Sequence, residues 1–333
     1  MKTDNDPFNR ATLIRIMAFS LCVPFLCWLT GCCTTPIAGS FKMPAEVNMA
    51  GRDRVILDTV NGQGGNLMTA RLKPELARAG FTVLDRRSFG TVTYEEIFRQ
   101  ISGAGSQSGT APKVTTAAVL IKGNVLRHDF NHAHRQVKFV QNGVEMVGYV
   151  DEGTATVEAA FDVVELATTQ VIATKSIQAT QSGQTDVFSS PPSLNPEPLY
   201  NDCYTSLVYQ FMKVISPYNV AVRDCMDKIS KLPENDSGVG MFMAGDYGRA
   251  VKDFEAALES AKTNPKIKPT HVSKVWHNLG LAHEFGGNYE QAVSCYRQAL
   301  ALQPNAEFQK SLNRALLRLR TKSVLQDQIG GSK

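Results

Sequence analysis

Two kinds of spacing between hydrophobic residues divide this chain, and each predicts a different kind of structure. Across residues 51–230, short apolar and β-branched runs alternate with glycine-rich breaks, which is typical of strands with a few helices. Across residues 233–322, apolar residues recur every three or four positions, as they do along the buried face of a helix. The chain is therefore predicted to hold an α/β domain followed by an all-α domain.

The α/β part begins with a strand, a helix and a second strand. The strands are predicted over Arg54–Val60 and Phe81–Asp85, and the helix lies between them, from Leu67 to a stop at Gly80. Glycines at positions 62, 64 and 65 occupy the place of a phosphate-binding loop, but their spacing fits no phosphate-loop motif. A sharp turn is the favoured interpretation, and the order of elements favours a mixed sheet.

Further elements follow in the same part of the chain. Asn142-Gly143 predicts the turn of a hairpin over residues 135–150. Strict alternation from Thr154 to Leu166 predicts a strand with one buried side, formed by Ala155, Val157, Ala159, Phe161 and Val163. Strands are also predicted over residues 115–125 and 171–179, and helices over residues 94–101 and 200–229, the last divided by Pro217.

The first 31 residues have the layout of a secretory leader. Lys2, Arg10 and Arg15 precede an uncharged apolar run over residues 16–29. This run is shorter than the roughly 20 residues of a membrane-spanning helix, and Pro24 interrupts it. A cleaved signal peptide over residues 1–31 is therefore favoured over a permanent membrane helix.

Leu29-Thr30-Gly31-Cys32 resembles the lipobox of bacterial lipoproteins. The resemblance implies cleavage before Cys32, a diacylglyceryl group on its thiol and an acylated amino terminus, so the protein would be held in the membrane by lipid. Because Cys33 and not Asp follows the acceptor, it also implies retention at the outer membrane, facing the periplasm. Residues 32–50 hold prolines and glycine without periodicity, which predicts a flexible tether.

Several strands of the α/β part resemble the CsgG-like family of bacterial lipoproteins, which includes the curli secretion channel and, more distantly, lipoprotein activators of penicillin-binding proteins. The matching pieces are Val55–Asp58, Phe81–Arg86, Ala118–Val125, and Phe161–Leu166 with Gln170–Ala173. The resemblance implies an α/β sandwich that serves protein contacts and oligomerisation. The predicted strands of the hairpin at residues 135–150 are near seven residues each, shorter than the roughly 9 to 11 of a membrane-spanning strand, which argues against a channel.

Two stretches near the C-terminus repeat each other without a gap, Ala244–Leu258 and Gly286–Leu300. The second, with Trp276, Gly280 and Pro304 in place, resembles the tetratricopeptide repeat (TPR). The first keeps its second helix but has a weak opening helix. A final amphipathic helix over Glu307–Leu319 is predicted to cap the stack, with a frayed tail after Thr321.

The resemblance to TPRs implies a concave groove that binds peptides or neighbouring proteins. In the better repeat the groove positions would be Lys274, His277, Leu281 and Glu284. With two repeats and a cap this groove is short, and the other interpretation is that the helices only pack against the rest of the chain.

Composition and motifs argue against chemistry. The net charge of +4 is too small and scattered for a nucleic-acid-binding protein. His128, His132 and His134 cluster near a strand end, where solvated loop histidines are favoured over a metal site, and Cys203 and Cys225 form either a disulfide or two buried thiols. No nucleophile or metalloprotease motif occurs, so no catalytic residue, metal or cofactor other than the lipid on Cys32 is predicted.

These expectations combine into one leading hypothesis about function. The chain is predicted to be an outer-membrane-anchored periplasmic adaptor that catalyses no reaction and binds envelope proteins or peptides through its repeats. Its CsgG-like domain would form homo-oligomers or dock on an envelope assembly. The alternatives are a subunit of a CsgG-like secretion channel and an activator of a cell-wall synthase.

Overall fold

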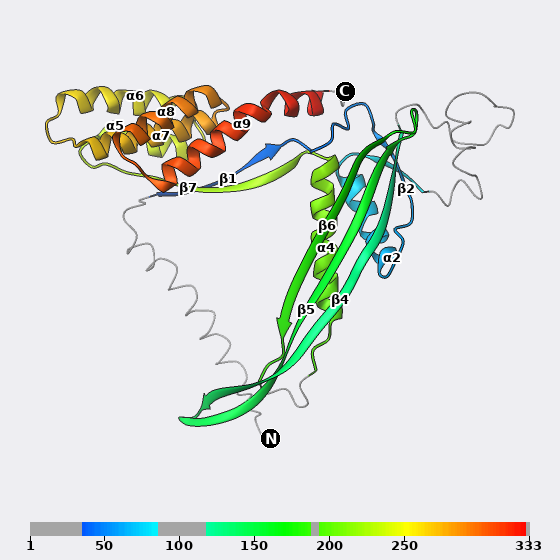
Figure 1. Cartoon of the computed structure of the whole chain (residues 1–333). Helices are drawn as coiled ribbons and strands as arrows, with labels where there is room; N and C mark the ends of the chain where they lie inside the picture. The colour runs from blue at the N-terminus through cyan, green and yellow to red at the C-terminus, as the bar shows by residue number, and fades with distance from the viewer. Residues whose placement is uncertain (1–34, 86–117, 188–192, 331–333) are drawn as a thin grey trace, which may run out of the picture. The chain divides into compact units, whose positions relative to one another are not determined.

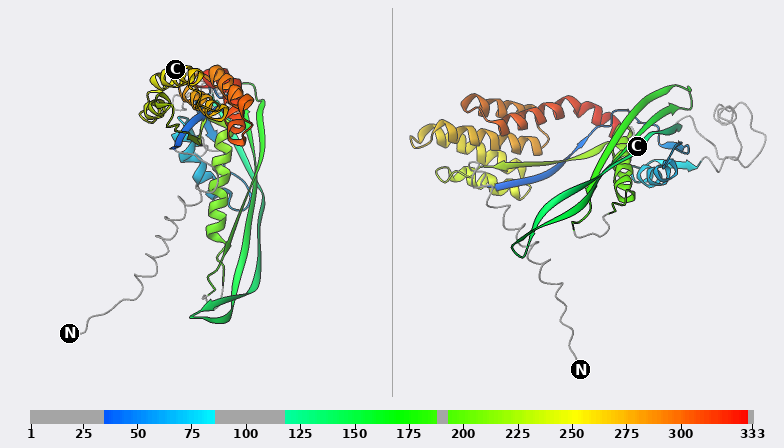
Figure 2. Two further views of the ribbon diagram at one scale, coloured as in Figure 1. Left: turned by 90° about the vertical axis from the view of Figure 1, so that its left-hand side faces the viewer. Right: turned by 60° about the horizontal axis from the view of Figure 1, so that its bottom comes forward.

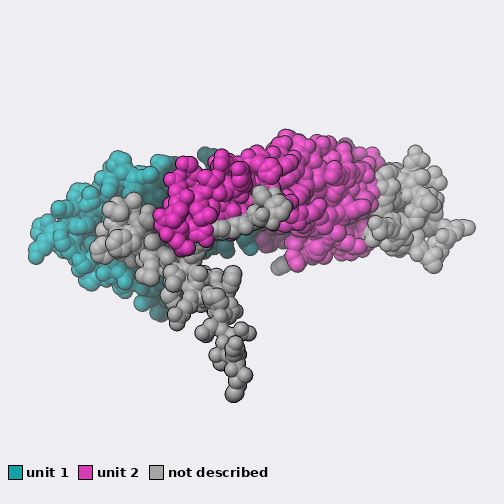
Figure 3. All heavy atoms as spheres, turned by 90° about the horizontal axis from the view of Figure 1, so that it is seen from below, with its two compact units in different colours: residues 1–41, 219–322 teal, residues 42–218, 323–333 magenta. Residues whose placement is uncertain are grey.

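The computed structural model describes residues 35–85, 118–187 and 193–330. The chain divides into two compact units (Figure 3). Unit 1 comprises residues 1–41 and 219–322, and unit 2 comprises residues 42–218 and 323–333. The predicted leader, the lipid acceptor Cys32 and the predicted helix over residues 94–101 lie outside the described residues.

Unit 2 is built on a five-stranded mixed sheet with the strand order β3-β2-β4-β5-β6 (Figure 1). The short strand β2 pairs in parallel with β3 and with the start of β4, whereas β4, β5 and β6 are antiparallel. The mixed sheet predicted from the order of elements is therefore confirmed. Its elements are β2 (Arg54–Leu57), α2 (Gly65–Arg78), β3 (Thr82–Asp85), β4 (Ala118–Gln141), β5 (Val144–Glu165), β6 (Val171–Gln184) and α4 (Glu197–Ile215).

Helices α2 and α4 pack against the sheet and enclose the hydrophobic core of unit 2 (Figures 1 and 2). The alternating residues of β5 confirm their predicted burial, since each is at most 1% exposed: Ala155, Val157, Ala159, Phe161 and Val163. Opposite them, α4 contributes Leu207 and Phe211, and the Phe211 ring stacks on Phe161 with 4.3 Å between centroids. Buried residues recur at every second position on β5 and with helical spacing on α4, so the two elements face each other with their apolar sides and enclose the core.

The glycine-rich stretch after β2 is the predicted sharp turn. Gly62 and Gly64 adopt φ values of 88° and 76°, in the left-handed region that glycine enters freely. A Cβ on Gly64 would lie 1.6 Å from the hydroxyl of Tyr204, so a larger residue does not fit. Gly80, with φ 93°, follows α2 as predicted for a helix stop.

The predicted hairpin exists, but its strands are far longer than expected. β4 has 24 residues and β5 has 22, because each predicted hairpin strand continues into a neighbouring predicted strand. A bulge between Val125 and Arg127 absorbs one residue, so pairing continues through the histidine segment that was expected to be a loop. The turn itself is as predicted, with positive φ at Asn142 and Gly143.

Two other sequence-based expectations were wrong. Residues after Pro217 were predicted to be helical, but Tyr218–Met226 forms strand β7. The predicted flexible tether contains strand β1 (Thr35–Met43), which pairs with β7 in a two-stranded sheet. Each strand supplies the other's backbone hydrogen bonds, and neither segment shows this partnership in its own composition.

Unit 1 contains this two-stranded sheet and a stack of helical hairpins. The helices are α5 (Pro233–Met243), α6 (Tyr247–Thr263), α7 (Pro269–Phe285), α8 (Tyr289–Leu302) and α9 (Ala306–Gly330), of which α9 belongs to unit 1 up to Lys322. In both hairpins a glycine allows close helix packing: a Cβ on Gly238 would lie 2.6 Å from the Phe254 ring, and one on Gly280 would lie 2.5 Å from the Tyr296 ring. The weak first repeat is therefore built like the second.

Helix α9 does not fray after Thr321 as predicted but continues to Gly330. The amide side chain of Gln328 is buried, donates to the carbonyl of Ala45 at 3.0 Å and accepts from its N–H at 2.8 Å. These two hydrogen bonds satisfy both backbone groups of Ala45 and hold the last turns of the helix. Helical periodicity in the sequence does not reveal this contact.

Candidate functional site

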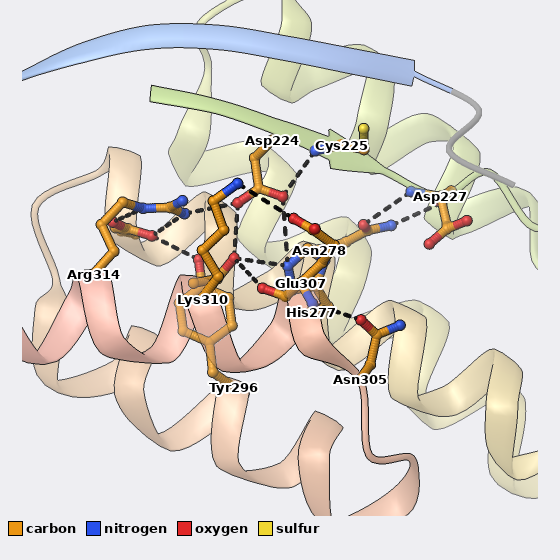
Figure 4. A network of polar contacts seen from close by, with 12 residues as sticks. Asp224, Cys225, Asp227, His277, Asn278, Tyr296, Asn305, Glu307, Lys310 and Arg314 are labelled. Carbon is orange, nitrogen blue, oxygen red and sulfur yellow. Dashed lines mark hydrogen bonds and ion pairs between the residues drawn. The ribbon is translucent and has the colours of Figure 1, made fainter. Parts of the chain in front are cut away.

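The four predicted groove residues all lie on α7, and Figure 4 shows the polar contacts around one of them, His277. His277, Leu281 and Glu284 are at most 2% exposed, and the Lys274 side chain is 27% exposed. Polar groups of β7, α8 and α9 contact His277 or Glu284, and Lys274 contacts Asp227, which directly follows β7. The sequence thus places these residues in one row along α7, and the structure shows what covers them.

Glu284 is the most deeply engaged of the four. Its carboxylate accepts two hydrogen bonds from the Arg314 guanidinium, at 2.7 and 2.8 Å, and a third from the Tyr296 hydroxyl at 2.7 Å. Arg314 also lies 2.9 Å from the Asp224 carboxylate on β7. One cation therefore neutralises part of the charge of two buried carboxylates, in a charge-assisted network.

The ionisation of this network follows from its burial. Burial opposes the charged form of Arg314, but the hydrogen bonds and charge of Glu284 outweigh it and raise the pKa of the guanidinium. Burial, followed by the charge of Glu284, raises the pKa of Tyr296 well above its ordinary value. At neutral pH the tyrosine is therefore a neutral donor and the arginine a fixed cation.

His277 occupies the middle of the row. Its Nε2 atom lies 3.2 Å from the Ser311 hydroxyl on α9, and its ring stacks on Phe308 with 4.5 Å between centroids. Burial lowers the pKa of His277 to about 4, against the attraction of Asp224. His277 is therefore neutral at pH 7, and Asp224, whose Oδ1 lies 3.8 Å away, is balanced by Arg314 instead.

A second polar group surrounds Asp227, at the first residue after β7. Lys274 approaches its carboxylate at 3.0 Å, and the side chains of Asn235 and Asn278 donate to its backbone carbonyl at 2.9 and 2.8 Å. Burial raises the pKa of Asp227, whereas Lys274 lowers it. Residues of α5 and α7 thus hold the end of β7 in place.

Residues of β7 or α9 therefore contact two of the predicted groove residues, His277 and Glu284. Sequence reasoning missed Asp224, Ser311 and Arg314, because they lie outside the repeat motif. One feature of the sequence does indicate that such partners exist. The repeat places the ionisable residues His277 and Glu284 on the face of α7 that packs against other elements, and buried charges require partners.

Ser311, His277 and Asp224 include the residue types of a hydrolase triad, but their arrangement differs from one. In a triad the histidine bridges serine and carboxylate, whereas here Ser311 donates directly to Asp224 at 2.7 Å. Ser311 is also fully buried, so no substrate can reach its hydroxyl. The network holds helices and strand together and does not have the geometry of a nucleophilic site.

Unit 2 has exposed apolar side chains at the far end of its β4–β5 hairpin, whose backbone is drawn in Figure 1. We call residues 135–150 the distal ribbon. It lies beyond the pairing with β6, which ends at Glu152, and beyond the pairing with β2, so no other strand of the described residues pairs with its β4 edge. Beside its β5 edge, the N–H of Thr185 donates to the carbonyl of Asp151 at 2.9 Å, and a Cβ on Gly148 would lie 2.4 Å from the Val187 side chain. Five large apolar side chains on it are between 42% and 71% exposed: Val140, Val144, Met146, Val147 and Tyr149.

The three candidate metal-ligating histidines lie along β4. His128 stacks on Tyr200 with 3.8 Å between ring centroids, and His134 pairs with the buried carboxylate of Asp151. His132 packs near Phe130. Among the described residues, no three His, Cys, Asp or Glu side chains come together in a way that could hold a metal ion.

The cysteines of the body also have clear positions. Cys203 on α4 and Cys295 on α8 are buried free thiols, and burial raises the pKa of each, to about 12 for Cys295. The suggested Cys203–Cys225 disulfide is therefore wrong, because Cys203 packs alone in the core of unit 2.

Comparison with known proteins bears on the two parts separately. Residues 273–306 match the family model of the tetratricopeptide repeat, which confirms the repeat built from α7 and α8. No curated protein sequence matches the chain. In the described residues, no helix combines the length and apolarity needed to cross a membrane.

Three solved structures are each similar to part of this chain. The N-terminal domain of stress-induced protein-1 from C. elegans is 17% identical (TM-score 0.24), over 25% of this chain and 65% of that domain. The minor lipoprotein from Acinetobacter baumannii is 13% identical (TM-score 0.26), over 49% of this chain and 91% of that one. The PelC dodecamer from Paraburkholderia phytofirmans is 12% identical (TM-score 0.28), over 54% of this chain and 98% of that one.

Proposed function

We propose that this protein is a lipid-anchored, non-catalytic adaptor of the bacterial envelope, and that its distal ribbon is a docking surface for a partner protein. The observation that carries the proposal is the exposure of five large apolar side chains on a ribbon whose β4 edge pairs with no other described strand. Uncovered strand edges accept an added strand, and apolar side chains beside them add contact area. A tetratricopeptide repeat in the same chain supports a role in protein interactions.

The groove of the repeats has a different role in this proposal. Its residues are engaged by β7 and α9, so a partner would have to displace Arg314 from Glu284 and Asp224 before it could bind there. Leaving a buried carboxylate without its cation is costly. We therefore assign first contact with the partner to the distal ribbon, while partner binding by Lys274, His277, Leu281 and Glu284 stays a prediction.

Membrane attachment enters the proposal through Cys32. Lipidation of that residue, retention at the outer membrane and orientation toward the periplasm rest on the lipobox resemblance of Leu29–Cys32 and its position after an apolar leader. A lipid on the N-terminus would hold both units at the membrane surface, where an envelope partner is accessible.

The proposal is tested by photocrosslinking in living cells. A photoreactive phenylalanine analogue replaces Tyr149 on the distal ribbon or, as a matched control, Tyr209 on α4, which are 56% and 55% exposed. A crosslink to a different envelope protein from position 149 alone is the expected result. Equal products from both positions, or none, would contradict docking at the ribbon.

One alternative is favoured by the same surface. Two copies of the chain could pair through the β4 edges of their ribbons, as a homo-oligomer or a channel subunit requires. In that case position 149 crosslinks to a second copy of this protein and to no other. The identity of the crosslinked chain therefore separates the adaptor from the oligomer.

A further inference from the structure

Two histidines lie on the same face of strand β4, directly before the distal ribbon. His132 and His134 are separated by one residue, and side chains two positions apart in a strand point to the same side of the sheet. Both side chains are exposed, and their ring centroids are 6.3 Å apart with the ring planes at 79°. Metal–nitrogen bonds are about 2.0–2.1 Å long, so two imidazoles that share one ion have centroids no more than about 6.5 Å apart. One metal ion can therefore reach both rings.

A buried carboxylate orients one of these rings. The Nδ1 atom of His134 pairs with Oδ1 of Asp151, the residue opposite it on β5, and Asp151 is 4% exposed. The other oxygen of this carboxylate accepts the N–H of Leu194 at 3.3 Å. In the neutral ring, Nδ1 carries the proton that Asp151 accepts, which leaves the lone pair of Nε2 to bind a metal. A carboxylate behind a histidine is the usual outer-shell arrangement of metal-binding imidazoles.

The residues around the pair determine what kind of site it can form. His128, the third histidine of the strand, stacks on Tyr200 with 3.8 Å between ring centroids and so belongs to the packing of α4 on the sheet. Across residues 35–85, 118–187 and 193–330, no third His, Cys, Asp or Glu side chain joins the pair to make a larger metal-binding group. Water would therefore fill the remaining coordination positions. Such a site is open, unlike the closed four-ligand site of a structural zinc ion.

We propose that His132 and His134 form a chelating site for a divalent transition-metal ion, with Asp151 as the positioning residue for His134. Imidazole is a ligand that suits Cu²⁺, Ni²⁺ and Zn²⁺, and Cu²⁺ binds most tightly of these in the Irving–Williams order. Ca²⁺ and Mg²⁺ require oxygen ligands, so they should not bind here. The inference concerns unit 2 alone, and it depends neither on the lipid anchor nor on docking at the ribbon.

The test is titration of the full-length protein, purified in detergent without an affinity tag, with CuCl₂. Binding is followed by calorimetry and by electron paramagnetic resonance. The expected result is one Cu²⁺ per chain, with hyperfine splitting from two imidazole nitrogens, and an excess of Ca²⁺ or Mg²⁺ should not displace it. His132→Gln and His134→Gln should each remove one nitrogen from the spectrum and weaken binding at least about tenfold. His271→Gln on α7 is the control and should leave the spectrum and the affinity unchanged.

A further variant separates positioning from metal ligation. Asp151→Asn should weaken Cu²⁺ binding about 10–100-fold while both nitrogens stay in the spectrum, because the ring of His134 remains but is no longer held by a carboxylate. Unfolding of the strand would instead remove both nitrogens. His132 is exposed, so His132→Gln tests the site even if the loss of the buried Asp151 carboxylate prevents folding.

Three results would overturn the inference. The first is the absence of Cu²⁺ binding by the wild-type protein. The second is a spectrum that His132→Gln and His134→Gln leave unchanged, which would place the ion elsewhere on the chain. The third is an equal loss of affinity in His271→Gln, which would show that the metal binds histidines without selecting this pair.

Discussion

Replacing Arg314 with methionine tests whether the buried network holds unit 1 together. The Arg314 side chain is 15% exposed, while Glu284 and Asp224 are 0% and 5% exposed. Methionine keeps much of the side-chain volume but leaves both carboxylates without a cation. Breaking a buried ion pair by removal of one partner costs about 3–5 kcal/mol. Because domains are stable by only about 5–15 kcal/mol, this loss should be a large part of the total.

The assay uses a natural probe of unit 1. The chain has two tryptophans, Trp28 in the predicted leader and Trp276 on α7, so in the processed protein the fluorescence during urea unfolding reports on the repeats. Arg320→Met is the matched control on the same helix, because Arg320 is exposed. The control should change stability by less than about 0.5 kcal/mol. If Arg314→Met unfolds at the same urea concentration as Arg320→Met at pH 7, the network is not a source of stability and this reasoning is wrong.

Three further predictions follow from individual residues. Gly280→Ala should destabilise unit 1 by about 1–3 kcal/mol in the urea assay, because the new Cβ would lie 2.5 Å from the Tyr296 ring. Gly240 has open space around it, so the control Gly240→Ala should not destabilise unit 1. His277 has a folded-state pKa of about 4, below its unfolded value near 6.5. Folding stability should therefore fall by up to about 1.4 kcal/mol per pH unit as the pH drops between these two values. His277→Asn should remove this pH dependence, and an unchanged slope in that variant would refute the assignment to His277. Cys32→Ala should abolish incorporation of a labelled fatty acid in growing cells, and retained label would refute the lipobox assignment.

The sequence identified elements whose signals are local. The Asn142-Gly143 turn, the alternation of β5 and the stop of α2 at Gly80 were predicted correctly, because turn chemistry and periodicity act over a few residues. The second repeat was equally accessible, since its glycine and aromatic positions are fixed by close packing within one hairpin.

Partners from distant parts of the chain were not accessible in this way. The composition around β1 predicts a tether and the pattern of β7 predicts a helix, whereas each segment becomes a strand through pairing with the other. Helix α9 was predicted too short, because Gln328 finds its hydrogen bonds on Ala45.

By itself, then, the sequence determined that this protein has a mixed α/β part, a repeat of paired helices and a row of four residues along one helix. Only the tertiary structure decided that Asp224 of β7 and Arg314 of α9 cover that row. The physical reason is that a buried charge demands an opposite charge, while nothing in the local pattern specifies which distant residue supplies it.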